Sequence, residues 1–366
     1  MSEGSAAEAV HVVMPGDVDR LSVASGGNVY DRRVCEGLAR TRPVHELPVS
    51  GSWPRPDGTA REDLAAALAG VPDGATVLMD GLVACGVPEV VVPEAGRLRL
   101  VILVHLPLAD ETQPPGAPPP DDLDVRERET LRASHAVVTT GRRTAGRLIE
   151  HHGLDAARVH VAPPGTDPAP LAPGTEDGTR LLCVASLTPR KGHDLLVEAL
   201  ARVGGHGWEL TCVGPLRRDL DQVARLRALI ERHGLDDRIH LAGPRTGERL
   251  DAAYAAADLL VLASRAETYG MVVTEALAHG LPVLATEVGG VPEALGRIAG
   301  GEPPGLLVPP EDPAALAGAL RRWLGEPDLR RRLRKLAAER RDTLPSWDDT
   351  TRALTGVLDG LDRVSP

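Results

Sequence analysis

Two glutamates eight positions apart are the residues of this chain with the clearest chemical potential. Glu267 lies in a polar turn after a buried apolar run, Leu259–Leu262, and Glu275 lies early in the helical pattern that follows. Unpaired N–H groups and the helix dipole favour an anion such as a diphosphate at the start of a helix. The amides that stand at this start are those of Gly270, Met271 and Val272. We expect the glycine to permit close approach of the anion.

The two carboxylates suit a different part of the same ligand. A carboxylate pairs poorly with phosphate, but it accepts two hydrogen bonds from the hydroxyls of a sugar or a ribose. Taken alone, glutamates at this spacing also fit a structural role, in which Glu267 caps the helix and Glu275 is solvated. The residues by themselves leave both interpretations open.

Lys191 and His105 are two further candidates. Lys191, with Arg190 beside it, stands where a helical pattern begins, and the helix dipole disfavours a cation there unless an anion is bound. His105 follows an apolar run, Leu98–Val104, where a lone histidine is more often structural. The misfit of Lys191 therefore favours a phosphate role, whereas the position of His105 decides nothing by itself.

The elements that must position these residues form two series of short apolar runs. Continuous apolar runs of this length, with helical patterns between most of them, are typical of parallel strands covered on both faces. Helical patterns lie, for example, at Asp194–Arg202, Asp219–His233 and Glu248–Ala257. The first series is Val10–Met14, Val44–Leu47, Thr76–Met79, Leu98–Val104, Ala136–Thr139 and Val159–Ala162. The second is Leu181–Ala185, Glu209–Val213, Ile239–Leu241, Leu259–Leu262, Val283–Ala285 and Leu306–Val308.

Twelve strands are too many for one ordinary sheet, so we expect two doubly wound α/β domains. A Pro/Gly-rich stretch from Pro163 to Thr175 marks the break between the two series. The predicted domains are 1–170 and 178–345. A second Pro-rich segment, Pro114–Pro120, reads as a ligand loop inside the first domain. The basic helix around Arg330–Arg341 is expected to present a solvated outer face.

Composition excludes several classes of function. The net charge of −11 without a long basic stripe argues against nucleic-acid binding. The four cysteines are far apart and predict small buried side chains rather than a zinc or redox site. The N-terminal segment lacks a signal-peptide pattern, and no apolar run approaches the roughly 20 residues that span a bilayer. We therefore expect a cytoplasmic protein. Arginines that are expected on the first helix and could face an anionic lipid are Arg32, Arg33, Arg40 and Arg42, although Asp31 and Glu36 dilute this signal.

Several motifs, in order, resemble the retaining glycosyltransferases of family 4, which have the GT-B fold and include glycogen-synthase-like and mannosyltransferase-like members. The pair Glu267-x7-Glu275 is followed by Gly280-Leu281-Pro282-Val283 and by Gly289-Gly290-Val291-Pro292-Glu293. The segment Ser186–His193 resembles the family's strand-to-helix connection, and Ser25-Gly26-Gly27 its first glycine loop. Three shorter matches are His105 in Val104-His105-Leu106-Pro107, Gly165-Thr166-Asp167 at a domain crossover, and Ser346-Trp347-Asp348.

The resemblance implies a fold and a set of roles. It implies two Rossmann-like domains with an interdomain cleft, and a C-terminal helix, 346–366, that packs back on the first domain. The donor is then a nucleoside-diphosphate sugar, UDP- or GDP-linked. Lys191 and Arg190 would hold its diphosphate, Glu275 its ribose and Glu267 its sugar, with His105 beside the reacting sugar. The donor-binding set is Gly26, Gly27, Arg190, Lys191, Tyr269, Gly270, Met271, Val272 and Glu275, and the catalytic set is His105, Glu267 and Lys191.

The resemblance also implies a metal-independent reaction without a cofactor, because GT-B enzymes neutralise the leaving diphosphate with side chains and helix dipoles. Three D-x-D triplets, at Asp17–Asp19, Asp122–Asp124 and Asp219–Asp221, are expected by chance in so acidic a chain. The family usually has a second basic residue where this chain has Ser186, so it is open whether Arg190 replaces it.

The sequence leaves the sugar, the base, the acceptor and the oligomeric state open, with a small-molecule acceptor favoured over lipid. Two alternatives share the fold: a nucleotide-sugar epimerase and a non-catalytic nucleotide-sugar binder. A nicotinamide dehydrogenase would need a G-x-G-x-x-G fingerprint, which is absent.

Overall fold

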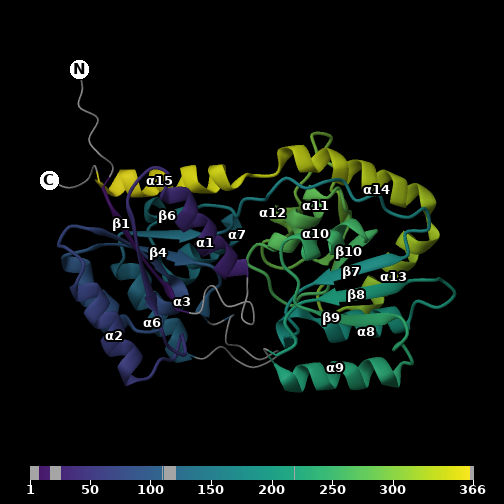
Figure 1. The fold of residues 1–366 in the computed structure, drawn as a ribbon, viewed down its shortest axis with the longest axis horizontal. Helices are drawn as coiled ribbons and strands as arrows, with labels where there is room; N and C mark the ends of the chain where they lie inside the picture. Colours follow the sequence, from purple (N-terminus) through teal and green to yellow (C-terminus); the bar gives the residue numbers. More distant parts are fainter. Residues whose placement is uncertain (1–7, 17–25, 109, 111–120, 218, 363–366) are drawn as a thin grey trace. The chain divides into compact units, whose positions relative to one another are not determined.

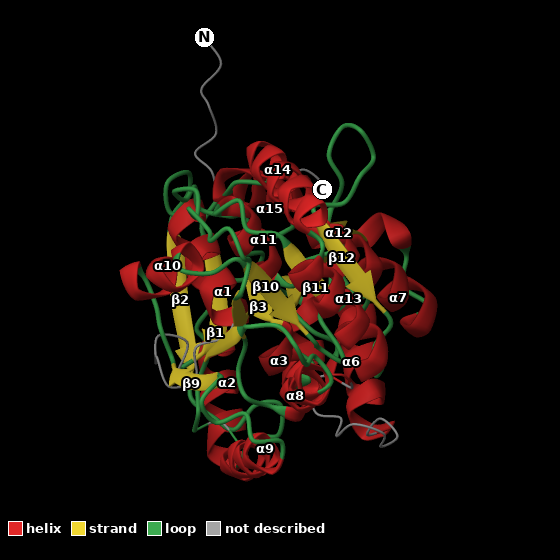
Figure 2. Cartoon of the chain, turned by 90° about the vertical axis from the view of Figure 1, so that its right-hand side faces the viewer, coloured by secondary structure: helices red, strands yellow, loops and turns green. Residues whose placement is uncertain are grey.

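The computed structural model describes residues 8–16, 26–108, 110, 121–217 and 219–362. The chain divides into two compact units. Unit 1 contains the described residues up to Gly165 together with those from Pro345 onward, and unit 2 runs from Thr166 to Leu344. Each unit contains a six-stranded sheet in which all the strand pairs found are parallel. The predicted α/β class, with two parallel sheets covered by helices, is confirmed (Figures 1 and 2).

Unit 1 has the strand order β2-β1-β3-β4-β5-β6. Its strands are β1 (Val10–Pro15), β2 (Val44–Val49), β3 (Thr76–Asp80), β4 (Arg99–Val104), β5 (Ala136–Thr139) and β6 (Val159–Val161). Its α-helices are α1 (Gly26–Leu38), α2 (Gly58–Ala69), α3 (Gly81–Ala84), α4 (Pro88–Val91), α6 (Asp121–Ala133), α7 (Arg142–His152) and α15 (Trp347–Asp362). Two short 3-10 helices are η2 (Val92–Gly96) and η3 (Ala156–Arg158).

Alternate residues of these strands belong to two separate cores. Leu78 packs in the core that includes side chains of α1 and α15, whereas its neighbours Val77 and Met79 pack in the core on the other face. Successive side chains of a strand point to opposite faces, so a fully apolar strand fills both cores at once. This is the physical reason that the continuous apolar runs predicted the central strands correctly, whereas the edge strands β2 and β6 are largely half-buried or exposed.

The C-terminal helix α15 packs against α1 within unit 1 (Figure 1). The ring of Trp347 lies edge-on to Tyr30, with centroids 5.9 Å apart, and the Arg33 guanidinium stands 5.7 Å from its centroid. Leu354 and Leu358 are fully buried in the same core. The last part of the chain is therefore part of the hydrophobic core of unit 1.

Unit 2 has the strand order β12-β11-β10-β7-β8-β9. Its strands are β7 (Arg180–Val184), β8 (Glu209–Val213), β9 (Ile239–Gly243), β10 (Leu259–Leu262), β11 (Val283–Thr286) and β12 (Gly305–Val308). Its α-helices are α8 (His193–Ala201), α9 (Leu220–Arg232), α10 (Glu248–Ala255), α11 (Met271–Ala278), α12 (Val291–Leu295), α13 (Pro313–Gly325) and α14 (Pro327–Arg340). Its 3-10 helices are η4 (Pro189–Lys191) and η5 (Arg341–Thr343). Figure 1 shows α8 and α9 on one side of the sheet and α11 and α12 on the other.

Each sheet has one point where the direction of winding reverses. In unit 1 the reversal lies between β1 and β3, and in unit 2 between β7 and β10. Open α/β sheets bind ligands beyond the carboxyl ends of the strands at such a point, because the two connections there diverge to opposite faces. The fold thus marks two places for ligands before any side chain is considered.

Two of the arginines that were expected to face solvent or lipid are buried. Arg330 of the basic helix is buried, and its Nη1 donates to the carbonyls of Trp323 and Leu324, both at 2.8 Å. The prediction of a solvated face is therefore wrong for Arg330. Arg40 and Arg42 follow α1 rather than lying on it, and Arg42 is buried in an ion pair with Asp359. Arg42 cannot face a membrane.

All four cysteines are free thiols and buried, as predicted. Among the residues that the structure describes, no helix combines the length and the apolar character needed to cross a membrane. The Pro-rich loop at 114–120 lies outside the described residues, as do Ser25, Asp17 and Asp19.

Candidate functional site

Lys191 and Glu267 meet at the switch point of unit 2. Lys191 follows β7 and Glu267 follows β10, and these two strands pair directly. Lys191 Nζ lies 2.6 Å from Glu267 Oε1, and Ser264 Oγ donates to the same oxygen at 2.7 Å. The Glu267 side chain is buried, with the residue only 8% exposed. Burial alone would raise the pKa of Glu267, but the charges of Lys191 and Arg190 outweigh it and hold that pKa below its usual value. Glu267 is thus an ionised acceptor beside a cation.

The turn that carries Lys191 approaches the end of β10 closely. Gly192 has φ +64°, and a Cβ at this position would lie 1.9 Å from the carbonyl oxygen of Ala263. Arg265 ties the two connections together by donating to the Pro189 carbonyl at 2.6 Å and to both oxygens of the Asp194 carboxylate at 2.8 Å. The hydrogen bonds of Arg265 therefore hold the turn that carries Lys191 in place. The close approach to Ala263 explains why the residue directly after Lys191 is a glycine.

The Gly-Gly pair after β11 supports the Glu267 turn from the other side. Gly289 has φ +46°, and a Cβ there would lie 1.5 Å from the carbonyl oxygen of Glu267. Gly290 N donates to that oxygen at 3.1 Å, and Thr286 Oγ1 donates to the Ser264 carbonyl at 2.5 Å. The physical role of the Gly-Gly motif is therefore to let the two turns approach each other closely. Only glycine, which has no side chain, can occupy position 289 and pack this closely against the turn.

The helix α11 begins directly after the turn. Gly270 is its N-cap residue, with φ +92°, and Met271 and Val272 are its first two residues. The first amides of a helix have no acceptor within the helix, so this end favours an anion. Tyr269 is buried in the core of unit 2, which gives its ring a structural position. The predicted phosphate-facing backbone is thus at a helix N-terminus, whereas the Tyr269 ring belongs to the core.

Glu275 lies one turn into α11 and is half-buried. Tyr254 donates its hydroxyl to Glu275 Oε2 at 2.7 Å, and the Tyr254 ring stacks on His279 with centroids 5.1 Å apart. Burial raises the pKa of Glu275, and the charges of Asp167 and Asp251 act in the same direction. The alternative of a solvated glutamate is therefore wrong. Sequence reasoning missed Tyr254, because nothing in the pattern of α10 distinguishes it from a core residue.

Arg190 also contributes to the turn that carries Glu267. Its Nη1 donates to the Ala266 carbonyl at 3.2 Å, and its charge lowers the pKa of Glu267. Ser186 is half-buried and supplies no charge. A second cation thus stands beside the Glu267 turn, although Ser186 occupies the position where the family has a basic residue.

His105 lies in unit 1, directly after β4. Its Nε2 is 2.6 Å from Asp31 Oδ1 and 4.0 Å from Asp80 Oδ2, and its ring lies edge-on to Tyr30 with centroids 5.2 Å apart. Asp80 is the last residue of β3, and Asp31 lies on α1, which Gly26 and Gly27 begin. Sequence reasoning missed both aspartates. Asp80 could have been recognised from the sequence, because it follows an apolar run as His105 does, and both residues therefore lie at the carboxyl ends of strands.

Two groups of side chains within the described residues have ligand atoms close enough to hold a metal ion. They are Asp31, Asp80 and His105, and Asp124, His151 and His152. In the D-x-D triplets, Asp122 pairs with Arg55, and Asp219 caps α9 by accepting from Gln222 N at 2.8 Å. Metal independence therefore stays a prediction.

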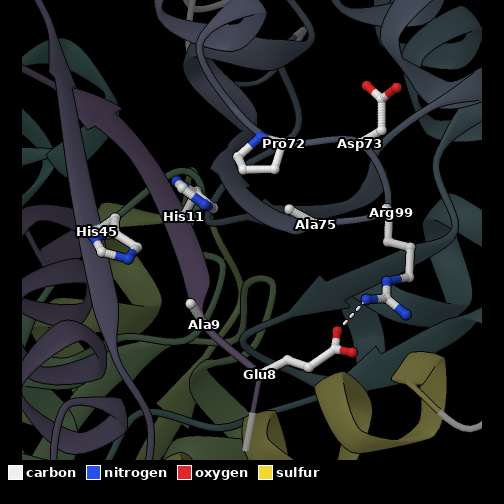
Figure 3. Close-up of a pocket in the computed structure, with 9 residues that line it drawn as sticks. Glu8, Ala9, His11, His45, Pro72, Asp73, Ala75 and Arg99 are labelled. Atoms are coloured by element: carbon white, nitrogen blue, oxygen red, sulfur yellow. Dashed lines mark hydrogen bonds and ion pairs between the residues drawn. The ribbon is translucent and has the colours of Figure 1, made fainter.

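A cavity of about 600 Å³ in unit 1 lies at the amino ends of the strands, opposite to the end of the sheet where His105 and Asp80 lie (Figure 3). His11, His45, Ala75 and Arg99 line it, and these residues stand at the amino ends of their strands or just before them. Asp80 and His105 follow the carboxyl ends. None of the predicted site residues lines this cavity.

Comparisons with known proteins find relatives in both sequence and fold. Residues 172–340 match the family described as glycosyl transferases group 1. Similar curated proteins include the D-inositol 3-phosphate glycosyltransferases of Salinispora tropica, 32% identical over 265 residues, and of Acidothermus cellulolyticus, 33% identical over 258 residues. Each match covers 66% of this chain but only 54% and 56% of those relatives, so the chain spans little more than half their length.

Solved structures match over nearly the whole chain. Sucrose-phosphate synthase from Thermosynechococcus elongatus has a TM-score of 0.81 at 22% identity, with 98% of this chain and 100% of that one covered. Anabaena HepE in complex with UDP-glucose has a TM-score of 0.70 at 17% identity, with 96% and 99% covered. At these identities the likeness shows the fold alone. The chain therefore has the GT-B fold, and its residues 172–340 belong to the glycosyl transferases group 1, as the resemblance to family-4 glycosyltransferases predicted.

Proposed function

We propose that this protein transfers a sugar from a nucleoside-diphosphate sugar to a small-molecule acceptor, with retention of anomeric configuration and without a metal. The observation that carries the proposal is the Lys191–Glu267 pair at the switch point of unit 2, beside the N-terminus of α11. A cation and a helix N-terminus suit a diphosphate, and a buried ionised carboxylate suits sugar hydroxyls. The group 1 match over the same residues supports this assignment.

In the proposed reaction the bond between the sugar C1 and the diphosphate oxygen breaks, and the acceptor oxygen bonds to C1 on the same face. The acceptor proton passes to the leaving phosphate oxygen. Lys191, Arg190 and the first amides of α11 stabilise the charge that develops on the diphosphate. Because they are already in place before the bond breaks, this stabilisation needs little reorganisation.

The two glutamates have different partners and therefore different proposed roles. Among the described residues, both hydrogen-bond donors to Glu267 fall on Oε1, so Oε2 is the oxygen that we assign to a sugar hydroxyl. Glu275 is anchored through Oε2 by Tyr254, and we assign it to the ribose hydroxyls. A carboxylate that is held by another side chain binds a hydroxyl with a smaller loss of rotational freedom.

In this proposal the amides of Gly26 and Gly27 contact the donor or the acceptor, and His105 contacts the reacting sugar. The relatives named D-inositol 3-phosphate glycosyltransferases make a phosphorylated cyclic polyol the first acceptor class to test. The structure of Anabaena HepE with UDP-glucose makes UDP-sugars the first donors. The expected cytoplasmic location stays a prediction.

The test is an assay of the purified full chain with UDP-, GDP- and ADP-sugars, with and without inositol 3-phosphate, in the presence of EDTA. We expect release of the nucleoside diphosphate and a product with the donor's anomeric configuration, identified by NMR. Conversion of the donor sugar without an acceptor would assign an epimerase instead. Donor binding without any turnover across an acceptor panel would assign a binder, and no donor binding at all would refute the proposal.

A further inference from the structure

Two aspartates with buried side chains stand beside His105. Asp31 is 5% exposed and Asp80 is 8% exposed, although ionised carboxylates are costly to bury without partners. They come from different elements, α1 and the end of β3, so the fold rather than local sequence brings them together. Both elements adjoin the β1–β3 switch point of unit 1. Buried acidic side chains at such a point need an explanation beyond packing.

The three side chains form one hydrogen-bonded group. His105 Nε2 lies 2.6 Å from Asp31 Oδ1, and a side-chain hydrogen bond with Asp31 is one of the causes that raise the pKa of Asp80. Two carboxylates can share a hydrogen bond only if a proton lies between them. Asp80 Oδ1 accepts from Leu82 N at 2.6 Å, which restrains the Asp80 carboxyl group. The Asp31 carboxylate that contacts His105 therefore lies beside a second carboxyl group, Asp80, that is itself held in place.

We propose that Asp31 and Asp80 are positioning residues that hold the His105 ring in one orientation, with a proton on Nε2, for sugar transfer. The inference rests on the proposed function, because His105 has a role in transfer only if the chain is a transferase. We call Asp31 and Asp80 together the His105 anchor. Asp31 acts through His105 and need not touch the substrate.

The proton between the carboxyls makes the anchor sensitive to pH. Burial, followed by the charge of Asp31, raises the pKa of Asp80 to about 7, while His105 acts in the opposite direction. Tyr30, Cys35 and Cys85 also face these carboxylates, but burial raises the pKa of each of them, so they stay neutral near pH 7. Asp80 therefore gains its negative charge as the pH rises through neutrality. Activity should change over the same range.

Unit 1 also contains a matched control. His152 Nε2 and Glu127 Oε2 form a second buried histidine–carboxylate pair, 3.1 Å apart, that belongs to no predicted site. The variant E127Q removes a buried charge beside a histidine, as D31N does, and its amide oxygen can still accept from Leu108 N, the second partner of Glu127. Each variant therefore replaces the carboxylate beside one buried histidine of unit 1 by an amide.

The experiment compares wild type, D31N, H105A, the double variant D31N/H105A and E127Q in the full chain. We expect D31N to lower kcat by about 10- to 100-fold, with the donor KM within about twofold, and to shift the pH profile. The double variant should be no worse than H105A alone, because Asp31 acts through that ring. The control variant E127Q should keep the kcat of the wild type. Additive losses, or wild-type kcat in D31N, would overturn the proposal.

A second measurement does not depend on activity. NMR of ¹⁵N-labelled histidine reports which nitrogen of His105 carries the proton, and we expect this to change in D31N but not in E127Q. If the ring responds in this way while no donor supports transfer, the anchor stands and the proposed function fails. An unchanged His105 signal in D31N would overturn the anchor. Activity that EDTA abolishes and a divalent metal restores, in wild type but not in D31N, would assign the three side chains to a metal and overturn it as well.

Discussion

The Lys191 ammonium and the Glu267 carboxylate lie 2.6 Å apart, although 76 positions separate them in the chain. They follow the two strands, β7 and β10, between which the winding of unit 2 reverses. The pair thus places one cation and one anion at the position where α/β sheets bind ligands. Removing one partner of this ion pair leaves the other charge uncompensated. Single substitutions therefore test the role of the pair.

Lys191→Met should weaken donor binding and also lower stability. Removing the ammonium takes a cation from the diphosphate and leaves the buried Glu267 charge without its ion-pair partner Lys191, and breaking a buried ion pair in this way costs about 3 to 5 kcal/mol. We expect the Kd for UDP to rise at least about tenfold in calorimetry and the melting temperature to fall. Lys335→Met is the control, because Lys335 is exposed on α14 of the same unit. Equal affinities in the two variants would remove Lys191 from the site.

Gly289→Ala should distort the Glu267 turn. A Cβ at this position would lie 1.5 Å from the Glu267 carbonyl oxygen, so the turn must shift. We expect a loss of kcat of about 100-fold and a stability loss of about 2 to 4 kcal/mol. Gly318→Ala in α13 is the control, because a Cβ there meets no atom within 4 Å and alanine stabilises a helix by about 0.5 to 1 kcal/mol. The two variants should therefore shift the unfolding midpoint in opposite directions, and a stable, active Gly289→Ala protein would contradict the proposed support.

Glu275→Gln should lose affinity for the ribose. If Glu275 binds the ribose hydroxyls, the variant weakens UDP binding by about tenfold or more, because a hydrogen bond to a charged group is lost. The same substitution should leave the affinity for 2′,3′-dideoxy-UDP almost unchanged. Calorimetry with the two nucleotides therefore separates a ribose contact from a general effect on folding. A similar loss for both ligands would assign Glu275 to structure alone.

Asp80→Asn should change how stability depends on pH. In the folded protein the pKa of Asp80 is raised to about 7, so the folded state binds this proton more tightly than the unfolded state. The stability from that proton is complete below the unfolded pKa of about 4 and is lost as the pH rises through about 7. Asparagine stays neutral at every pH. Relative to wild type, the variant should gain up to about 4 kcal/mol between pH 4 and pH 8.

Urea unfolding at several pH values measures this difference. Asp73→Asn is the control, since Asp73 is exposed on the same unit and is paired with Arg97 at the surface. Its effect on stability should be small and constant across the range. A flat difference between Asp80→Asn and wild type from pH 4 to pH 8 would show that Asp80 is ionised throughout.

The amino-acid pattern by itself determined the strands, the sheet type and the segment that binds the donor in our proposal. Continuous apolar runs give buried parallel strands because both faces of such a sheet are covered, and all twelve runs became strands. The position of Glu267, Gly270 and Glu275 around one helix start is also local, since it depends only on where α11 begins. Local geometry is what a sequence pattern encodes.

Contacts between distant segments were decided only by the tertiary structure. Local pattern did not show that Arg330 is buried, that Tyr254 holds Glu275, or that Asp31 and Asp80 meet at His105. The order of the strands brings β3 beside β4 and β7 beside β10, and the side chains that follow those strands then become neighbours. Polar side chains at element ends carry no periodic signal, so their partners are determined by strand order and not by spacing in the chain.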